Sequence, residues 1–75
     1  MKTETIFSNV FSIPLQDIHD FTKLHDIPTW DSMTHMVLIT ALEEEFQIQL
    51  SGDEIADMQT VGDAKTFMAA HGASI

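Results

Sequence analysis

Neither glycine nor proline interrupts the segment from Asp31 to Phe46, which makes it the strongest helix signal in this chain of 75 residues. Glycine and proline disfavour the interior of a helix more than any other residue, so their absence permits one continuous element. Asp31 is a residue type that caps exposed backbone amides at the start of a helix. The sequence therefore predicts a helix over residues 31–46, with Asp31 at its amino end.

Apolar residues also recur at helical spacing near the amino end of the chain. Between Glu4 and Phe11 they form a stripe of Ile6, Phe7, Val10 and Phe11. Pro14 should close this first helix. From Ile13 to Trp30 the spacing is irregular, which indicates a long structured loop that can include a helical turn. Apolar anchors should pin this loop, and they are Leu15, Ile18, Phe21, Leu24 and Ile27.

Two further helices are signalled after residue 50. Ser51-Gly52-Asp53-Glu54 has the S-x-x-E form of a capping box, which predicts a brief helix through about Met58. Thr60 can cap a last helix that stops near Gly72. The buried side of that helix should consist of Val61, Ala64, Phe67 and Met68.

Together these segments predict an all-α fold class, a small four-helix bundle of three main helices and one short helix with a long first loop. Strand signals are weak, because the alternation at residues 47–50 covers only four residues between two helices. A chain of 75 residues fits one small domain, and no internal repeat or low-complexity segment divides it. We expect residues 1–75 to form a single domain.

The predicted helix over 31–46 carries two apolar faces. Its core stripe consists of Leu38, Ile39, Leu42 and Phe46. The nearly opposite side, hereafter the methionine face, consists of Met33, Met36, Val37 and Thr40. Either the helix is enclosed on both sides, or the methionine face is left open for a partner whose shape flexible thioethers can fit. Glu43 and Glu44 flank the far end of this face and should give it an anionic rim.

Charge narrows the classes of partner. Twelve acidic side chains against three basic ones give a formal net charge of −9, which repels nucleic acids and anionic membranes and attracts basic protein surfaces. Acidity that merely keeps a small domain soluble explains the charge equally well. No segment approaches the about 18 apolar residues of a membrane span. We expect no nucleic-acid binding, no membrane insertion and a cytoplasmic location.

Ser32 stands where the irregular loop becomes helix. Its hydroxyl should be exposed beside unpaired backbone amides, where the anionic charge of a phosphodiester is stabilised. An ordinary helix-start serine is the simpler interpretation of Ser32 taken alone. The chain contains no cysteine, so any thiol chemistry that it performs must come from a cofactor.

The run Trp30-Asp31-Ser32-Met33, followed by residues 38–46, resembles the acyl carrier protein family. The likeness continues through Ile48, the turn over residues 51–55, and Thr60-Val61-Gly62-Asp63. The resemblance covers most of the chain. The first helix and the long loop agree with the family only in their length and general composition. Asp-Ser followed by an apolar residue is a weak motif alone, but the spaced helix and capping signals make it strong.

This resemblance implies that a phosphopantetheinyl transferase attaches the 4′-phosphopantetheine arm of coenzyme A to Ser32. The thiol of the arm would carry an acyl group as a thioester and replace the missing cysteine. Asp31 would help to dock the transferase or to position its metal-bound substrate. Acyl-loading and acyl-processing enzymes with basic and apolar docking surfaces would be the other partners. The residues that would meet them are Trp30, Met33, Met36, Val37, Thr40, Glu43 and Glu44.

Some residues depart from the carriers of fatty acid synthesis. Trp30 replaces a small residue, Thr34 and Val37 stand where acidic residues are frequent, and Met33 replaces leucine. The Trp-Asp-Ser form is more similar to dedicated carriers of polyketide, peptide or surface-polysaccharide pathways. We expect a monomeric acyl carrier of a fatty acid, polyketide or related pathway. The alternatives are a peptidyl or aminoacyl carrier of a non-ribosomal pathway, and an adaptor that is never loaded.

An enzyme is a different interpretation of the same residues. Ser32 and His35 are one turn apart, as a nucleophile and its base would be. However, no third group that could orient His35 is apparent, and so short a chain offers little shelter for an oxyanion. We therefore expect His35 to be a partly buried histidine with satisfied hydrogen bonds, and the protein not to be an enzyme.

A metal site is a further alternative, because imidazole and carboxylate groups can share a zinc ion. The candidate ligands are His19, Asp20, His25 and Asp26. Histidines among scattered acids in a loop are far more often solvated. We expect no metal site.

Overall fold

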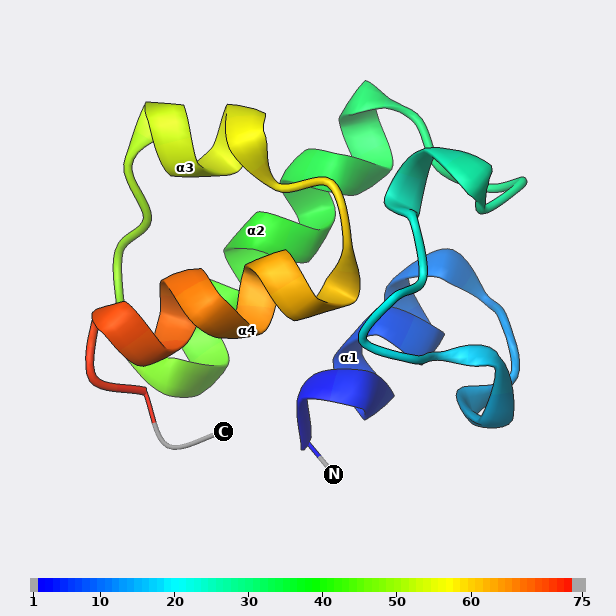
Figure 1. The fold of residues 1–75 in the computed structure, drawn as a ribbon, viewed down its shortest axis with the longest axis horizontal. Coiled ribbons are helices and arrows are strands. Elements are labelled where there is room, and N and C mark those ends of the chain that lie inside the picture. The colour runs from blue at the N-terminus through cyan, green and yellow to red at the C-terminus, as the bar shows by residue number, and fades with distance from the viewer. Residues whose placement is uncertain (1, 74–75) are drawn as a thin grey trace.

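The computed structural model describes residues 2–73, which fold into four α-helices and two 3₁₀ turns (Figure 1). The elements are α1 (Lys2–Phe11), η1 (Leu15–Asp17), η2 (Leu24–Asp26), α2 (Ser32–Phe46), α3 (Gly52–Asp57) and α4 (Val61–Ala70). Residues 2–73 contain no β-strand, and an isolated antiparallel bridge joins Lys23 to Thr60. The predicted all-α bundle of three main helices and one short helix is confirmed. Within the same residues, no helix has the length and apolarity to cross a membrane.

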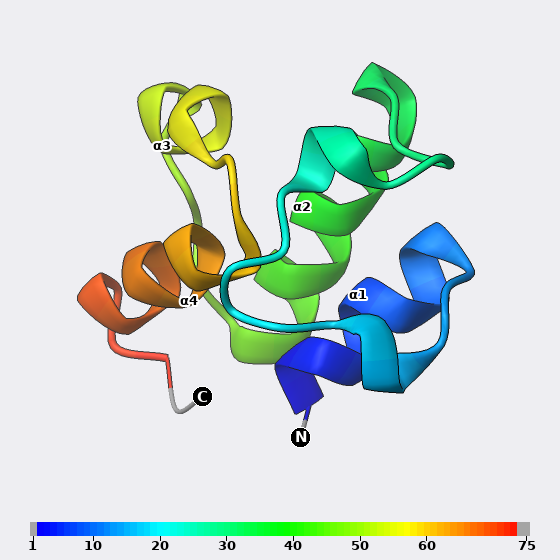
Figure 2. The same cartoon turned by 45° about the vertical axis from the view of Figure 1, so that its right-hand side comes forward.

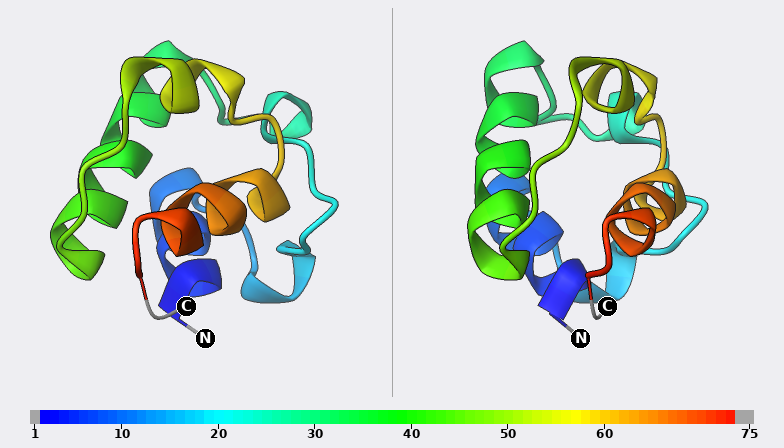
Figure 3. Two further views of the ribbon diagram at one scale, coloured as in Figure 1. Left: turned by 60° about the vertical axis from the view of Figure 1, so that its left-hand side comes forward. Right: turned by 90° about the vertical axis from the view of Figure 1, so that its left-hand side faces the viewer.

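α2 is the longest helix, and the other elements gather on one side of it. Figure 2 shows α1 on one flank of α2 and α3 with α4 on the other. In both views of Figure 3, α2 lies at an edge of the molecule with no other element on its outer side. Only one of its two apolar faces is therefore covered by the fold.

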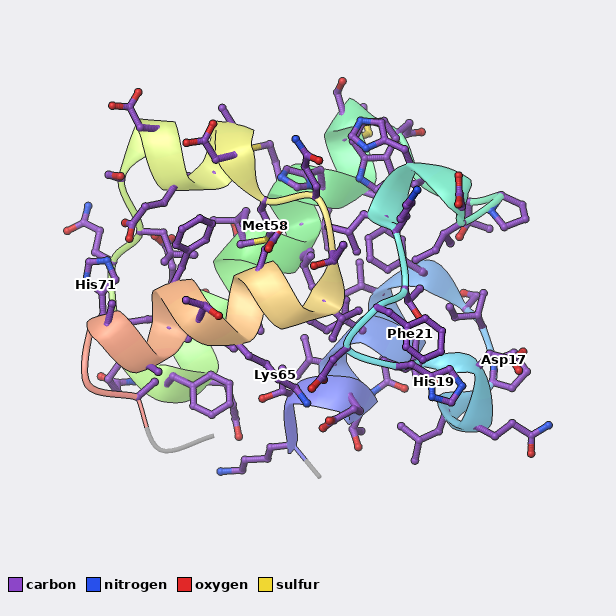
Figure 4. All side chains as sticks on the ribbon, viewed as in Figure 1. Asp17, His19, Phe21, Met58, Lys65 and His71 are labelled. Atoms are coloured by element: carbon purple, nitrogen blue, oxygen red, sulfur yellow. The ribbon has the colours of Figure 1, made fainter. Side chains whose placement is uncertain are left out.

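The core lies on the inner side of α2, and every helix contributes to it, although α3 does so only through the partly buried Ile55. Leu38, Ile39 and Leu42 are fully buried there, while Phe46 is partly buried and packs against them. α1 contributes Phe7 and Phe11, whose ring centroids are 6.3 Å apart. The remaining buried apolar side chains are Ile18, Leu24, Ile27, Leu50, Met58, Val61, Ala64 and Met68. Figure 4 shows Met58, which follows α3, pointing inward over α2.

Helix starts agree closely with the capping signals in the sequence. Asp31, Ser51 and Thr60 each form a complete capping box with the residue three positions later. These boxes satisfy backbone amides that would otherwise lack partners. At the carboxyl end of α4, Gly72 takes a positive φ of 84° two residues after Ala70. This conformation is open to glycine and confirms Gly72 as the stop.

α1 ends before the proline that was expected to close it. Ser12 already leaves the helix with a positive φ of 55°, and the amide of Ile13 donates to the Ser8 carbonyl at 3.2 Å. Pro14 follows in extended conformation at the start of η1. The helix is therefore terminated by its own left-handed cap, two residues ahead of Pro14.

The long loop is only partly pinned as predicted. Ile18, Leu24 and Ile27 enter the core, but Leu15 is 49% exposed and Phe21 is 77% exposed. The prediction for these two anchors is wrong. Backbone hydrogen bonds fix the middle of the loop instead. The amide of Leu24 donates to the Gln59 carbonyl at 2.9 Å, and the first two amides of α4 donate to loop carbonyls.

Candidate functional site

Ser32 is the first residue of α2, and its side chain is exposed. Among residues 2–73, no group hydrogen-bonds to its hydroxyl. The helix that it begins is 15 residues long, so partial positive charge from the aligned peptide dipoles accumulates beside this hydroxyl. The position therefore offers an available oxygen in a place that favours a negatively charged substituent.

Asp31 caps this helix and is itself exposed. Its Oδ1 accepts a hydrogen bond from the Thr34 amide at 2.7 Å, while the Thr34 hydroxyl accepts one from the Asp31 amide at 2.8 Å. These bonds stabilise the ionised carboxylate, and the backbone amide of Thr34 is the main reason that the pKa of Asp31 lies below its usual range. Asp31 thus both caps α2 and places a negative charge next to Ser32.

The other serines are placed differently. Ser8 donates to a backbone carbonyl at 2.6 Å, and the Ser51 hydroxyl accepts a backbone hydrogen bond in its capping box. Ser12 is exposed but follows the carboxyl end of α1, where partial negative charge disfavours an anion. Ser74 lies outside the described residues. Among the described serines, Ser32 alone combines an uncommitted hydroxyl with the amino end of a helix.

The methionine face is open, which decides between the two alternatives for α2. Met33, Met36 and Val37 are 77%, 51% and 52% exposed. The Thr40 hydroxyl donates to the Met36 carbonyl at 3.0 Å, so this polar group is turned to the helix backbone. A shallow hollow of about 710 Å³ runs along this face and is lined by Ser32, Met33, Met36, Val37, Thr40, Ala41 and Glu44. An apolar surface thus extends directly from the Ser32 hydroxyl.

Glu43 does not lie with Glu44 at the rim of the methionine face. The prediction that both residues flank this face is therefore wrong for Glu43. The Glu43 side chain is half-buried, and its Oε2 accepts a hydrogen bond from the Leu50 amide at 2.9 Å. This bond fastens the segment after α2 back onto the helix. Glu44 is exposed and lies at the far end of the hollow. The rim therefore carries one carboxylate from this pair.

Trp30 and His35 form a connected pair on the other side of Ser32. The Trp30 indole N–H donates to Nδ1 of His35 at 3.2 Å, and Nε2 of His35 lies 3.0 Å from the Ile55 carbonyl. An indole only donates and a carbonyl only accepts, so these partners assign the neutral Nε2–H tautomer. His35 is buried, more fully than the partial burial that was predicted, and both of its nitrogens are engaged, as was expected. No nitrogen remains to accept a proton from Ser32.

A second hollow, of about 310 Å³, opens between the start of α2 and α3. Ser32, Trp30, His35 and Met36 line one side. The other lining residues are His25, Gly52, Ile55, Ala56 and Met58, none of which was predicted to lie near Ser32. They come from segments far apart in the chain, and no spacing in the sequence brings them together.

The loop histidines and aspartates do not converge on a common point. The His19 ring stacks on Phe21 and the His25 ring lies against Trp30, with centroids 4.9 Å and 4.0 Å apart. The Asp20 carboxylate accepts a hydrogen bond from Lys65 at 2.7 Å. Among residues 2–73, no three histidine, cysteine, aspartate or glutamate side chains are grouped to hold a metal ion.

Comparison with known proteins assigns the chain to a family. A family model described as the phosphopantetheine attachment site matches residues 3–68. The acyl carrier protein of Acidothermus cellulolyticus is 31% identical over 64 residues, which cover 85% of this chain and 76% of that protein. The acyl carrier protein of Clostridium acetobutylicum is 31% identical over 70 residues, which cover 93% of this chain and 91% of that protein. The chain belongs to the acyl carrier protein family.

Solved structures agree with this assignment. A Mycobacterium tuberculosis protein assigned as an acyl carrier protein matches with a TM-score of 0.84 and 29% identity, covering 92% of each chain. The holo acyl carrier protein of Geobacter metallireducens matches with a TM-score of 0.80 and 31% identity, covering 95% of this chain and 86% of that one. The resemblance seen in the sequence is confirmed. As an acyl carrier protein, the chain uses phosphopantetheine as its prosthetic group and interacts with biosynthetic enzymes.

Proposed function

We propose that Ser32 is the attachment residue for 4′-phosphopantetheine, and that residues 1–75 act as one carrier domain that presents thioester-bound acyl groups to partner enzymes. The observation that carries this proposal is the exposed, uncommitted Ser32 hydroxyl at the amino end of α2. A phosphodiester at this oxygen gains from the partial positive charge at the amino end of the helix dipole. The arm supplies the thiol that the chain lacks, because the sequence contains no cysteine.

Attachment at Ser32 is a displacement reaction at phosphorus. The serine oxygen forms a phosphodiester with the pantetheine phosphate of coenzyme A, the pyrophosphate bond breaks, and adenosine bisphosphate leaves. A transferase must remove the hydroxyl proton, since both nitrogens of the neighbouring His35 are engaged. The same engagement supports a carrier that is modified and loaded by other enzymes and performs no catalysis itself.

The methionine face is the surface on which we propose that the transferase and acyl-processing enzymes dock. Met33, Met36 and Val37 expose half or more of their area next to Ser32, with Thr40 continuing the face. Thioethers adapt to different apolar pockets, which suits a carrier with several successive partners. Asp31 and Glu44 stand at the two ends of this surface, so partners should present cations there. Trp30 borders Ser32 from the second hollow and is the outermost contact that we propose.

Mass spectrometry of the intact protein tests the attachment residue. Purified protein is incubated with coenzyme A, Mg²⁺ and a phosphopantetheinyl transferase of broad specificity. We expect wild type to gain the mass of one phosphopantetheine and Ser32→Ala to gain none. Ser12→Ala is the matched control, since it removes another exposed hydroxyl without touching α2. Wild type that stays unmodified would favour the unloaded adaptor, and a modified Ser32→Ala variant would refute the assignment.

The chemical class of the cargo distinguishes the biosynthetic pathways in which the carrier could act. We propose a fatty acyl, polyketide or related acyl group, and the alternative is an amino acid or peptide from a non-ribosomal pathway. The protein is isolated from its source organism under conditions that preserve thioesters, and the mass of the ejected arm with its cargo is determined. An acyl mass supports the proposal. A mass that corresponds to an aminoacyl group supports the alternative.

A further inference from the structure

Phe21 is an exposed aromatic residue that neither the core nor the Ser32 site explains. It leaves 77% of its surface open to solvent, although phenylalanine is among the residues most often buried. The His19 ring stacks on it with a centroid distance of 4.9 Å and an interplanar angle of 8°. Figure 4 shows both rings on the long loop, and Asp17 belongs to the same turn, because the Thr22 hydroxyl donates to the Asp17 carbonyl at 3.4 Å.

The turn that holds Phe21 is fixed to α4 on both sides of this residue. The Gly62 amide donates to the Asp20 carbonyl at 2.8 Å, and the Val61 amide donates to the Thr22 carbonyl at 3.1 Å. A side chain at Gly62 would place its first carbon 3.0 Å from the Asp20 oxygen, so glycine allows this close approach. An aromatic ring on a backbone fixed in this way loses little conformational freedom when it binds a partner.

Charge around Phe21 is net negative. Asp17 is exposed and has no ion-pair partner among the described residues. Lys65 binds the carboxylates of both Asp20 and Glu4, so this group of three retains one negative charge. Lys23 is the nearby exposed cation of the loop, and the whole chain carries −9. A second copy of this chain or an anionic membrane would be repelled, whereas a basic protein surface would be attracted.

This surface lies away from the attachment site. In the right-hand view of Figure 3, α2 and the loop segment near residue 20 form opposite edges of the molecule. A protein that contacts Phe21 therefore leaves the methionine face and Ser32 accessible to another enzyme.

From these observations, we infer that Phe21, with His19 and Asp17, forms a second docking surface that binds a protein with an apolar pocket bordered by lysine or arginine residues. This protein differs from the enzymes that dock on α2. It holds the carrier while Ser32 faces a catalytic partner, which raises the effective concentration of the cargo at that partner. The inference concerns a surface separate from the proposed attachment site.

Site-specific cross-linking identifies the occupant of this surface. The full chain, with Phe21 replaced by p-benzoylphenylalanine, is produced in its source organism and irradiated, and the attached protein is identified by mass spectrometry. That protein is then purified, and its Kd for the holo carrier is measured by calorimetry. We expect Phe21→Ser to raise the Kd by about tenfold or more, as for an aromatic anchor in an interface.

Variants elsewhere on the carrier make the result specific. Asp17→Lys should raise the Kd clearly more than Asp57→Lys, which changes net charge equally at an exposed position on α3. Met36→Glu should change this Kd less than about twofold. Equal binding of wild type and Phe21→Ser, cross-linking to a second copy of this chain, or no cross-linked protein would overturn the inference. Phosphopantetheine uptake is measured on the same variants, so failure at Ser32 and failure at Phe21 are distinguished.

Discussion

The two apolar faces of α2 differ in burial, although both consist mainly of apolar side chains on the same helix. On the inner face, Leu38, Ile39 and Leu42 are at most 1% exposed. On the methionine face, Met33 and Met36 leave half or more of their surface in solvent. The inner residues have rigid branched side chains that pack in a fixed core, whereas the outer methionines are unbranched and adaptable. Apolar surface on this helix thus serves stability on one side, and we propose that it serves recognition on the other.

This difference predicts that equal truncations on the two faces have unequal costs. Leu42→Ala removes a fully buried side chain and leaves a cavity, so we expect a loss of about 2–5 kcal/mol in the free energy of unfolding. Met36→Ala, which removes the same number of heavy atoms from the methionine face, should cost less than about 1 kcal/mol. Urea unfolding followed by circular dichroism measures both. Similar midpoints for the two variants would mean that the faces have been assigned the wrong way round.

Replacing Lys65 tests whether a half-buried ion network away from α2 also contributes to the stability of the fold. Lys65 on α4, which is labelled in Figure 4, binds Glu4 on α1 and Asp20 in the loop. The Glu4 side chain is 13% exposed, so Lys65→Met leaves a largely buried carboxylate without its cation. We expect a loss of about 1–3 kcal/mol at neutral pH, smaller than for Leu42→Ala.

The pH dependence of this loss distinguishes the ion network from simple packing. The hydrogen bond from Lys65 is the main reason that the pKa of Glu4 lies below its ordinary value of 4.5. A carboxylate with a lowered folded-state pKa stabilises the fold above the unfolded value, and this contribution disappears as the pH falls through the folded value. The stability difference between wild type and Lys65→Met should therefore narrow below about pH 4.5. A difference that is constant with pH would indicate lost packing of the lysine stem.

The cap of α2 is expected to contribute less than the ion network. Asp31→Ala removes the acceptor of the Thr34 amide and should cost about 0.5–2 kcal/mol. Asp31→Asn keeps a capping oxygen and removes the charge, so its stability should stay closer to wild type. If Asp31 serves the transferase, both variants slow phosphopantetheine uptake, and Asp31→Asn does so without a matching loss of stability. Uptake that follows stability alone would limit Asp31 to capping.

Features set by nearby residues could be predicted from the sequence. The caps at Asp31, Ser51 and Thr60 depend on a side chain and an amide three positions apart, and the core stripes depend on helical spacing. The exposed position of Ser32 followed from the same local logic. The exposure of the methionine face could not be predicted in this way, because burial depends on which elements cover α2.

Contacts between distant segments account for the failures. Phe21 and Leu15 were expected inside because they are apolar, but the loop backbone pairs with residues 59–62 and turns Phe21 outward. Glu43 was expected at the rim, yet its carboxylate binds the Leu50 amide. The second hollow joins residues near position 25 to those near 55. None of these pairings leaves a periodic signal in the sequence.

The smallest effect on stability is expected for Met36→Glu. This variant gives the sharpest test of the difference between the two apolar faces of α2. Met36 is 51% exposed, so a charge there remains in contact with water and the free energy of unfolding should change by less than about 0.5 kcal/mol. Enzymes that dock on the methionine face must bury this position, and burying an unpaired carboxylate is costly. We therefore expect at least about tenfold slower phosphopantetheine uptake at limiting carrier concentration. Gln49→Glu, which adds the same single negative charge at an exposed position outside the methionine face, serves as the control. Unfolding of Met36→Glu would show that this face belongs to the core, and normal uptake by a folded variant would move the docking surface away from Met36.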